Sequence, residues 1–243
     1  MTTPPEGALP QARVVALHCF PVKSMGGIAA TRLDVAADGV VGDRDWAVYD
    51  AAGKLASGKH TRRFRRMDPV FALVARPEGE EDVVLTLPDG TEHVAGRPGT
   101  DDALSAHFGE PVRLGREDRV PHQDAAAVSL VGTATLAELG RHEGDGRVLD
   151  PRHLRANIVL ETDEPYAEDS WAGRELTVGG VRLRVTEPTQ RCRMVGVAQV
   201  GLEPRDGMLR VVSDQHDLLA GVYARGPHPR AGGPRRRGDP ALT

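Results

Sequence analysis

The chain has 243 residues, of which 27% are charged, and a formal net charge of −4. A protein that binds nucleic acid through its phosphates normally carries net positive charge, which argues against that class. No apolar run reaches the roughly 18 residues that a membrane helix needs, and the first residues lack the basic start and apolar stretch of a secretory signal. We therefore expect a cytoplasmic protein that binds neither nucleic acid nor a membrane.

The numbers of cysteines, lysines, glycines and prolines exclude further classes of protein. The two cysteines, Cys19 and Cys192, are too few for a disulfide scaffold or a tetrahedral zinc site. Only three of the 31 basic residues are lysines, namely Lys23, Lys54 and Lys59. The 28 glycines and 18 prolines predict many turns and argue against a coiled coil or a helical repeat.

The first half of the chain is predicted to consist mainly of strands. Residues 1–12 are interpreted as a disordered tail. The patterns predict strands at 13–20, 28–35 and 70–76, hairpins over 46–57 and 83–95, and a short helix over 101–108. Gly53 is expected to supply a positive φ in the first hairpin, and Asp101 or Asp102 to cap the helix.

The second half begins at a predicted boundary near residue 120, which divides the chain into domains at 13–120 and 121–243. Strands are predicted at 127–131, 157–161 and 193–197, a hairpin over 175–186, and helices at 133–140 and 204–211. Gly140 is expected to end the first of these helices. Three hairpins and few short helices favour a mainly β (α+β) fold with barrel-like architecture.

Two clusters in the first half contain groups that bind anions. In Phe20–Gly27 (FPVKSMGG), Lys23 and Ser24 directly follow a strand, and two glycines then allow close backbone approach. In Gly39–Trp46 (GVVGDRDW), Arg44 stands between two acids, which can aim its guanidinium at an anion. Taken alone, the first is more typical of an ordinary turn and the second of a surface ion-pair network.

Other clusters are weaker signals. The basic run 59–66 (KHTRRFRR) is interpreted as a solvated face, because the net charge is negative and Phe64 is its only aromatic residue. Arg155 and Asn157 alternate into a predicted strand and are expected to face the same side. In 166–171 (YAEDSW), adjacent carboxylates usually point apart, so we expect loop capping and a core position for the tryptophan.

Cys192 is the more informative of the two cysteines. It lies between Arg191 and Arg193, and adjacent cations stabilise the thiolate, the form that acts as nucleophile or metal ligand. A lone cysteine is more often buried and inert, so both interpretations stay open for Cys192, whereas Cys19 within an apolar strand is expected to be inert. The chain contains no H-E-x-x-H, G-x-S-x-G or G-x-G-x-x-G motif.

Together these clusters resemble the MOSC-domain proteins, many of which carry a β-barrel domain before the MOSC domain. The similarity rests on FPVKSMGG and GDRDW in the first half and on LRANIV, YAEDSW, RC, GVYA and GDP in the second. It implies a MOSC β-barrel at 121–243 preceded by a smaller β-barrel-like domain at 13–120. The stretch 226–237 departs from the family pattern, because it is richer in arginine and proline than the family's final strands.

The resemblance also implies a molybdenum cofactor, a pterin dithiolene with a terminal phosphate. Cys192 would ligate the molybdenum or carry a persulfide. Lys23, Ser24 and Arg44 match family positions that hold the pterin and the phosphate. Further positions around the cofactor correspond to Ser129, Arg155, Asn157, Arg191 and Tyr223.

From the resemblance we expect a molybdenum-dependent oxidoreductase that cleaves the N–O bond of small N-hydroxylated substrates. Its electrons would come from a separate flavin or iron–sulfur partner, since the chain has no cysteine-rich ferredoxin segment. Pyridoxal phosphate is not expected, because no cysteine-desulfurase domain with its pyridoxal lysine is present. Two alternatives stay open: a sulfur carrier that uses a Cys192 persulfide, and a non-catalytic cofactor carrier.

Overall fold

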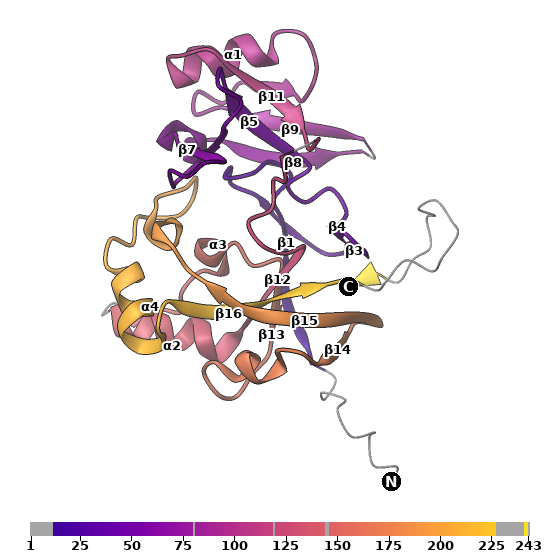
Figure 1. Cartoon of the computed structure of the whole chain (residues 1–243), viewed down its shortest axis with the longest axis vertical. Helices are drawn as coiled ribbons and strands as arrows, with labels where there is room; N and C mark the ends of the chain where they lie inside the picture. The colour runs from indigo at the N-terminus through magenta and orange to yellow at the C-terminus, as the bar shows by residue number, and fades with distance from the viewer. Residues whose placement is uncertain (1–11, 80, 119, 144–145, 227–240, 243) are drawn as a thin grey trace.

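Seven strands drawn from both halves of the chain form the largest sheet of the computed structural model, which describes residues 12–79, 81–118, 120–143, 146–226 and 241–242 (Figure 1). Their order is β14 (Glu175–Val178), β15 (Val181–Gln190), β16 (Leu219–Arg225), β12 (Val128–Gly132), β13 (Ile158–Leu160), β1 (Val14–Cys19) and β2 (Ile28–Ala30). Neighbouring strands are antiparallel except β12 and β13, which are parallel. We call this sheet and its helices the large unit.

The centre of this sheet is buried on both faces, which explains the unbroken apolar runs of β12 and β13. Leu130 and Ile158 face one core cluster, together with alternate residues of β14 and β15. Val131 and Val159 face the other, beneath the helices. These are α2 (Thr133–Glu143), α3 (Pro151–Leu154) and α4 (Met208–His216), with the short turn η3 (Arg193–Gly196). The turn η2 (Ala167–Trp171) contributes Trp171 to the first cluster.

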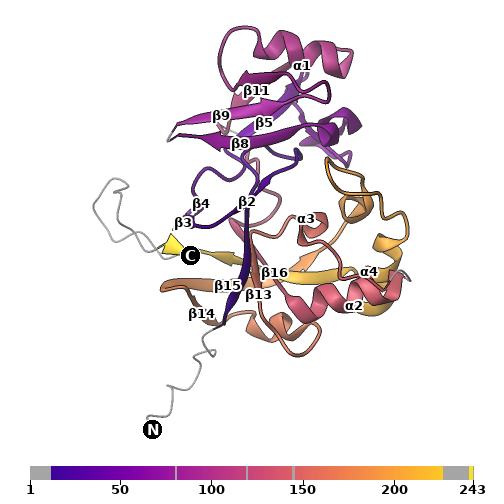
Figure 2. The ribbon, with the colours of Figure 1, turned by 180° about the vertical axis from the view of Figure 1, so that it is seen from behind.

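The small unit lies above the large unit in Figures 1 and 2 and has its own core. One of its sheets has the order β11 (Val112–Arg116), β5 (Trp46–Asp50), β6 (Leu55–Ser57) and β7 (Phe64–Arg66). The other contains β10 (Glu92–Val94), β9 (Asp82–Thr86) and β8 (Val74–Glu78), and the unit also holds η1 (Asp68–Ala72) and α1 (Thr100–Phe108). Near the junction, β17 (Ala241–Leu242), β3 (Leu33–Ala36) and β4 (Gly39–Val40) form a third small sheet.

The predicted mainly β fold with few short helices is confirmed. The hairpins predicted over 46–57 and 83–95 are present, and Gly53 has the expected positive φ of 76°. The third hairpin forms at its two-glycine turn, and its second strand continues to Gln190. Trp171 lies in the core as predicted.

Several local predictions are wrong. The strand predicted over 28–35 breaks into β2 and β3, the stretch 70–76 begins in η1, and 193–197 forms η3 rather than a strand. The predicted helix at 204–211 begins only at Met208. Gly140 lies inside α2 instead of ending it. A Cβ at this position would overlap the backbone of Arg147, so the close approach of that segment accounts for the glycine.

The helix α1 is also capped differently from the prediction. Its N-cap is Gly99 in the left-handed conformation, with no side-chain cap. Asp101 instead accepts a hydrogen bond from the backbone N–H of Leu114, 2.9 Å away, which ties the helix to β11. The acid therefore links two elements of the small unit.

The two units are interleaved along the chain. The strands β1 and β2 precede the small unit in sequence but pair within the sheet of the large unit. The loop between them crosses to the small unit, where Val22 and Met25 join its core. The predicted boundary near residue 120 stays a prediction. Almost all of the predicted tail 1–12 and of the stretch 226–237 lies outside the described residues.

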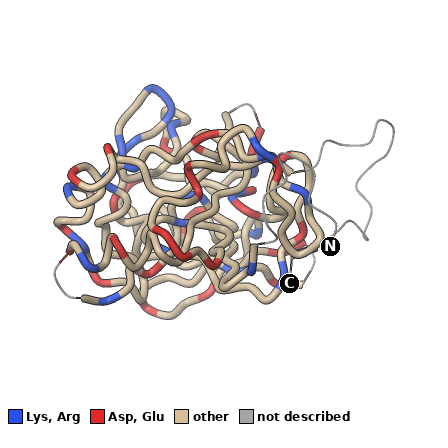
Figure 3. The backbone as a smooth tube through the Cα atoms, turned by 90° about the horizontal axis from the view of Figure 1, so that it is seen from below, with Lys and Arg blue, Asp and Glu red and all other residues tan. Residues whose placement is uncertain are grey.

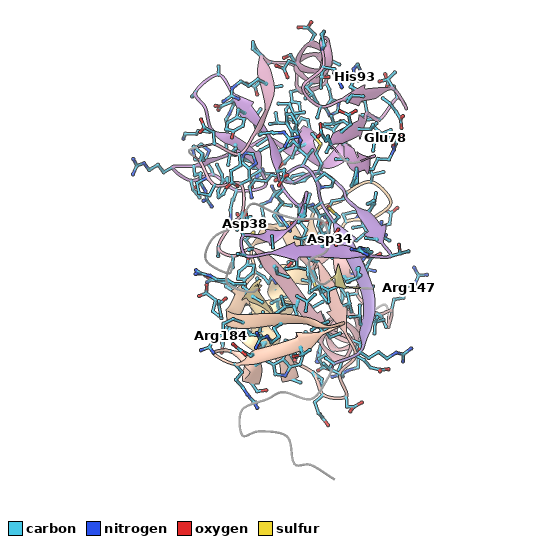
Figure 4. The ribbon with its side chains drawn as sticks, turned by 90° about the vertical axis from the view of Figure 1, so that its right-hand side faces the viewer. Asp34, Asp38, Glu78, His93, Arg147 and Arg184 are labelled. Carbon is cyan, nitrogen blue, oxygen red and sulfur yellow. The ribbon has the colours of Figure 1, made fainter. Side chains whose placement is uncertain are left out.

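Charges are distributed around the whole molecule. Figure 3 shows basic and acidic residues interspersed along the backbone, and Figure 4 shows side chains such as Glu78 on the small unit and Arg184 on the large unit. Among the helices of the described residues, α2 is the longest and has 11 residues. Within the described ranges, no helix is both long and apolar enough to span a bilayer.

Candidate functional site

A cavity of about 550 Å³ lies where the small and large units meet. This volume is within the range of small-molecule sites. Residues from both units line it, including Lys23, Ser24, Arg44, Lys59, Asp124, Ser129, Arg155, Glu187, Arg191, Cys192 and Tyr223. Eight of the nine site residues predicted from the sequence are thus brought together, and Asn157 is the exception.

Three of the lining residues have unusual backbone conformations. Ser24, Arg44 and Arg155 have φ values of 67°, 58° and 51°, and they are half of the six non-glycine residues with positive φ in the described ranges. Such conformations cost about 1–3 kcal/mol each and persist where surrounding structure enforces them. Here the backbone N–H of Arg44 donates to Phe20 at 2.8 Å, and that of Lys23 donates to Trp46 at 2.8 Å.

Lys23 and Lys59 share one carboxylate oxygen at the cavity. Their Nζ atoms lie 3.2 and 2.9 Å from Oδ1 of Asp124 and 4.6 and 4.7 Å from the ring centre of Phe64. The Lys23 side chain is only 6% exposed. Burial and the nearby Arg44 lower its pKa to about 8, although Asp124 opposes this shift.

Burial by itself would raise the pKa of the Asp124 carboxyl. The two ammonium groups outweigh burial and hold this pKa well below its usual range. The carboxylate therefore stays ionised at neutral pH and neutralises part of the positive charge of the cavity wall.

Arg44 is held by the buried carboxylate of Asp43. Its Nη1 pairs with Asp43, and its Nη2 donates to the carbonyl of Arg155 at 3.1 Å. Burial lowers the pKa of Arg44, but Asp43 more than compensates and raises it. The other oxygen of Asp43 accepts from the backbone of Phe20 at 2.8 Å and from Asn157 at 3.0 Å.

Asn157 is buried behind the cavity wall rather than in it. Its amide donates to Asp43 and, at 3.2 Å, to the carbonyl of His18, while its oxygen accepts from the backbone N–H of Ser129 at 3.2 Å. The prediction that Arg155 and Asn157 share a strand face is wrong, because Arg155 ends α3 in a left-handed turn before β13 begins. Asn157 thus has a structural position beneath Arg44.

Arg155 lines the cavity and has one guanidinium nitrogen without a hydrogen-bond partner. Its Nη1 donates to the carbonyl of Met25 at 2.7 Å, and its guanidinium lies 4.3 Å from the ring centre of Phe20. The buried Nη2 atom has no hydrogen-bond partner. Burial and the neighbouring Arg44 lower the pKa of Arg155 to about 9. A buried donor of this kind is costly unless a ligand satisfies it.

The two arginines beside Cys192 point in different directions. Arg191 donates to the carbonyls of Ala220 and Leu154 at 2.7 and 2.8 Å, and burial lowers its pKa to about 10. Arg193 reaches into the small unit, where it donates to Gly58 and pairs with Asp68, both at 2.9 Å. Cys192 itself is the extended N-cap of η3 and is partly exposed at the cavity.

The donor set limits how a metal could bind here. Within the described ranges, no group of three or more His, Cys, Asp or Glu side chains could hold a metal ion. Cys19 is buried in the large unit, where burial and Asp43 raise the pKa of its thiol to about 12.

Sequence reasoning missed three residues of this region. Lys59 was assigned to a solvated face but lines the cavity, whereas Arg66 of the same run does form a surface pair with Asp68. Asp124 belongs to no recognisable motif. The sequence feature that could have singled out Lys59 is the rarity of lysine among the basic residues of this chain.

His122, the third missed residue, is fully buried two positions before Asp124. Its Nδ1 lies 2.9 Å from the carbonyl of Arg44 and its Nε2 lies 2.7 Å from the Tyr49 hydroxyl. A carbonyl only accepts, so Nδ1 carries the proton that it donates to Arg44. Burial lowers the pKa of His122, so Nε2 is free to accept from Tyr49. His122 therefore anchors the loop that carries Asp124.

Two family profiles together match nearly the whole chain. The profile described as the MOSC domain matches residues 105–238, and that of the MOSC N-terminal beta barrel domain matches residues 11–107. The chain belongs to the MOSC-domain family. The predicted resemblance is thereby confirmed, and the small unit with the strands before it corresponds to the MOSC N-terminal barrel.

Curated relatives of this MOSC protein are named molybdenum cofactor sulfurase. The Homo sapiens relative is 26% identical over an alignment of 245 positions, and the alignment covers 80% of this chain and 27% of the relative. The Danio rerio relative is 27% identical over an alignment of 259 positions, and the alignment covers 85% of this chain and 31% of the relative. The MOSC chain thus spans less than a third of these relatives.

Among solved structures, the YUAD protein from Bacillus subtilis aligns with 95% of this MOSC chain and 90% of its own chain. The TM-score is 0.39 and the sequence identity is 15%.

Proposed function

We propose that this MOSC protein binds a molybdenum cofactor in the cavity between its two units, with Cys192 as the protein ligand of the metal. The main support for this proposal is that Cys192 and five cationic side chains line the same cavity. These are Lys23, Arg44, Lys59, Arg155 and Arg191, and the carboxylates on the same wall are Asp124 and Glu187.

The residues fit the chemistry of such a group. Excess positive charge and the unsatisfied Nη2 of Arg155 suit an anionic, hydrogen-bonding ligand. A thiolate is a soft ligand that suits a transition metal whose other ligands come from a dithiolene. The lack of a protein-only metal cluster in the described ranges agrees with a metal that arrives with its own ligands.

Each side chain has a role in this proposal. Lys23, Ser24 and Arg44 hold the phosphate and pterin from the side of the small unit, and Arg155 and Arg191 do so from the large unit. Ser129 Oγ lies 3.0 Å from the carbonyl of Arg155 and supports its backbone. Burial raises the pKa of Tyr223, so its hydroxyl stays protonated and is a hydrogen-bond donor at neutral pH.

The reaction that we propose is the two-electron reduction of a small N-hydroxylated compound. The N–O bond breaks, two electrons and two protons are consumed, and an amine and water leave. When bound, the molybdenum group supplies the oxygen-atom and two-electron chemistry. The chain's own residues bind and orient the group, and Lys59 and Asp124 on the cavity wall are partly exposed to solvent. A separate flavin or iron–sulfur protein supplies the electrons.

Sulfur transfer is the second candidate, favoured by the names of the curated relatives and by the partly exposed Cys192. In this alternative the Cys192 thiol carries a persulfide and passes its outer sulfur to an acceptor. A non-catalytic carrier would share cofactor binding with the first candidate but would show no turnover.

The proposal is tested on the full chain purified from a molybdenum-replete host. We expect stoichiometric molybdenum and pterin, together with turnover of a hydroxylamine compound in the presence of a chemical reductant. Protein without pterin or molybdenum would overturn it, and cyanide-labile sulfur in that protein would favour sulfur transfer. Molybdenum and pterin without turnover would indicate the carrier.

A further inference from the structure

We propose that Lys23 and Lys59 form a binding subsite for a phosphate group, and that Asp124 is an exchangeable counter-ion which leaves when the phosphate binds. Both Nζ atoms approach the same oxygen, Oδ1 of Asp124, at 3.2 and 2.9 Å. That oxygen marks a position at which another anionic oxygen can contact both ammonium groups. This inference rests on the proposed function only for the identity of the molecule that carries the phosphate.

Both ammonium groups have a second contact besides Asp124. Both lie over the Phe64 ring, at 4.6 and 4.7 Å from its centre, where the π face attracts cations. The ring itself is only 3% exposed and belongs to β7 of the small unit. A ligand that replaces Asp124 therefore meets two lysines that are already positioned.

The side chains of Lys23 and Asp124 differ in how far they are exposed to solvent. The Lys23 side chain is 6% exposed, so its ammonium needs an anionic partner where it stands. The Asp124 side chain is 44% exposed and lies on the loop between the two units, so it can regain hydration without unfolding either unit. Exchange by departure of the carboxylate is thus the favoured direction.

A phosphate offers more to this subsite than the carboxylate does. It carries up to two negative charges and three acceptor oxygens, and lysine binds it as a point charge. Arg44 lines the same wall and influences the pKa of Lys23, so a third cation lies within electrostatic range. Because Asp124 stays ionised at neutral pH, exchange requires competition by an anion rather than protonation.

The test uses the full chain without bound cofactor, and inorganic phosphate as the probe in calorimetric titrations at low ionic strength. Removal of the competing charge in Asp124→Asn should tighten phosphate binding by about tenfold or more, and Lys59→Gln should weaken it by a similar factor. Glu92→Gln is the matched control, since it removes an exposed carboxylate that pairs with Arg76 outside the cavity lining and should change the affinity less than threefold. Circular dichroism confirms that each variant is folded.

Weaker or unchanged phosphate binding in Asp124→Asn relative to Glu92→Gln would overturn the inference. This result is independent of the proposed function, because the protein can bind pterin without any exchange at Asp124. If Asp124→Asn binds phosphate more tightly and also retains more pterin during purification, the subsite receives the cofactor's phosphate. If phosphate affinity rises while pterin content does not, the subsite serves a phosphate on another ligand.

Discussion

Arg44 donates a hydrogen bond from Nη2 to the backbone carbonyl of Arg155, 3.1 Å away and 111 positions later in the chain. The two guanidinium groups also contact the Phe20 ring, at 5.2 and 4.3 Å from its centre. The small and large units are thus joined through the residues that line the cavity. Changes at these residues affect ligand binding and the contact between the units together.

Loss of the anion-binding cations should reduce cofactor retention. A buried charge-assisted contact contributes about 1.5–3 kcal/mol, so Lys23→Ala and Arg44→Ala should each lower cofactor affinity by one to two orders of magnitude. Turnover per bound molybdenum should change little, because these groups would contact the phosphate and pterin. Pterin content and turnover are measured together, with the exposed Arg66→Ala as control. Full occupancy with lost turnover would show that the roles are assigned wrongly.

The two cysteines should behave differently. Cys192→Ala should abolish turnover even where pterin still binds, whereas Cys19→Ala should keep activity. In the unsubstituted protein without bound cofactor we expect one fast-reacting thiol, that of Cys192, because Cys19 is buried and burial raises its pKa to about 12. Mass spectrometry after brief alkylation identifies the labelled cysteine. Rapid labelling of Cys19, or full activity of Cys192→Ala, would contradict this prediction.

Anion affinity of the cofactor-free protein should fall as the pH rises through about 8. Burial and Arg44 lower the pKa of Lys23 to that value, and Asp124 only partly opposes them, so the cation that binds the anion is lost above it. Sulfate is the suitable probe, since its charge stays constant over this range. Lys23→Arg should bind sulfate without this inflection, because a guanidinium stays charged. An unchanged inflection in that variant would assign the titration to another group.

Asn157 should matter for stability. Asn157→Ala leaves the carbonyl of His18 and the backbone N–H of Ser129 without their side-chain partner, in a position that is 1% exposed. Unsatisfied buried groups cost about 1–3 kcal/mol each, so the free energy of unfolding should fall by about 2–4 kcal/mol. Urea denaturation measures the change, with the exposed Ser170→Ala as control. A loss below that of the control would show that the network is dispensable.

Gly140→Ala should destabilise the protein although the substitution lies inside a helix. Helix propensity alone would favour alanine by about 1 kcal/mol. A Cβ at this position, however, would lie 1.7 Å from the carbonyl oxygen of Arg147, so the backbone would have to move. We expect a net loss of about 1–3 kcal/mol in urea denaturation. The exposed Arg141→Ala in the same helix is the control, and stabilisation by Gly140→Ala would contradict the predicted overlap.

The elements that could be predicted are those whose signal is local. The hairpins follow from alternating apolar residues and turn residues such as Gly53, which act over a few positions. The stretch 193–197 could not be assigned in this way, because its apolar residues suit a strand equally well. In the structure this stretch begins with the turn η3, and its first residue, Arg193, contacts Gly58 and Asp68, which lie more than 100 positions away in the sequence.

The same distinction applies to the cavity. The family motifs identified Lys23, Arg44 and Cys192 from the sequence, and the structure shows that they line one space. Lys59 and Asp124 were missed because their pairing joins the small unit to the loop after it, and neither residue stands in a distinctive motif. Asn157 lies in a family motif, yet its side chain serves the packing behind Arg44.

The place of β1 in the sheet of the large unit has a consequence during translation. This strand pairs with β13, which leaves the ribosome roughly 140 residues later. At about 5–20 residues per second, the nascent strand waits roughly 7–28 s for that partner. Throughout this time its unpaired edge is available to other chains, so we expect chaperones to bind this segment while synthesis continues.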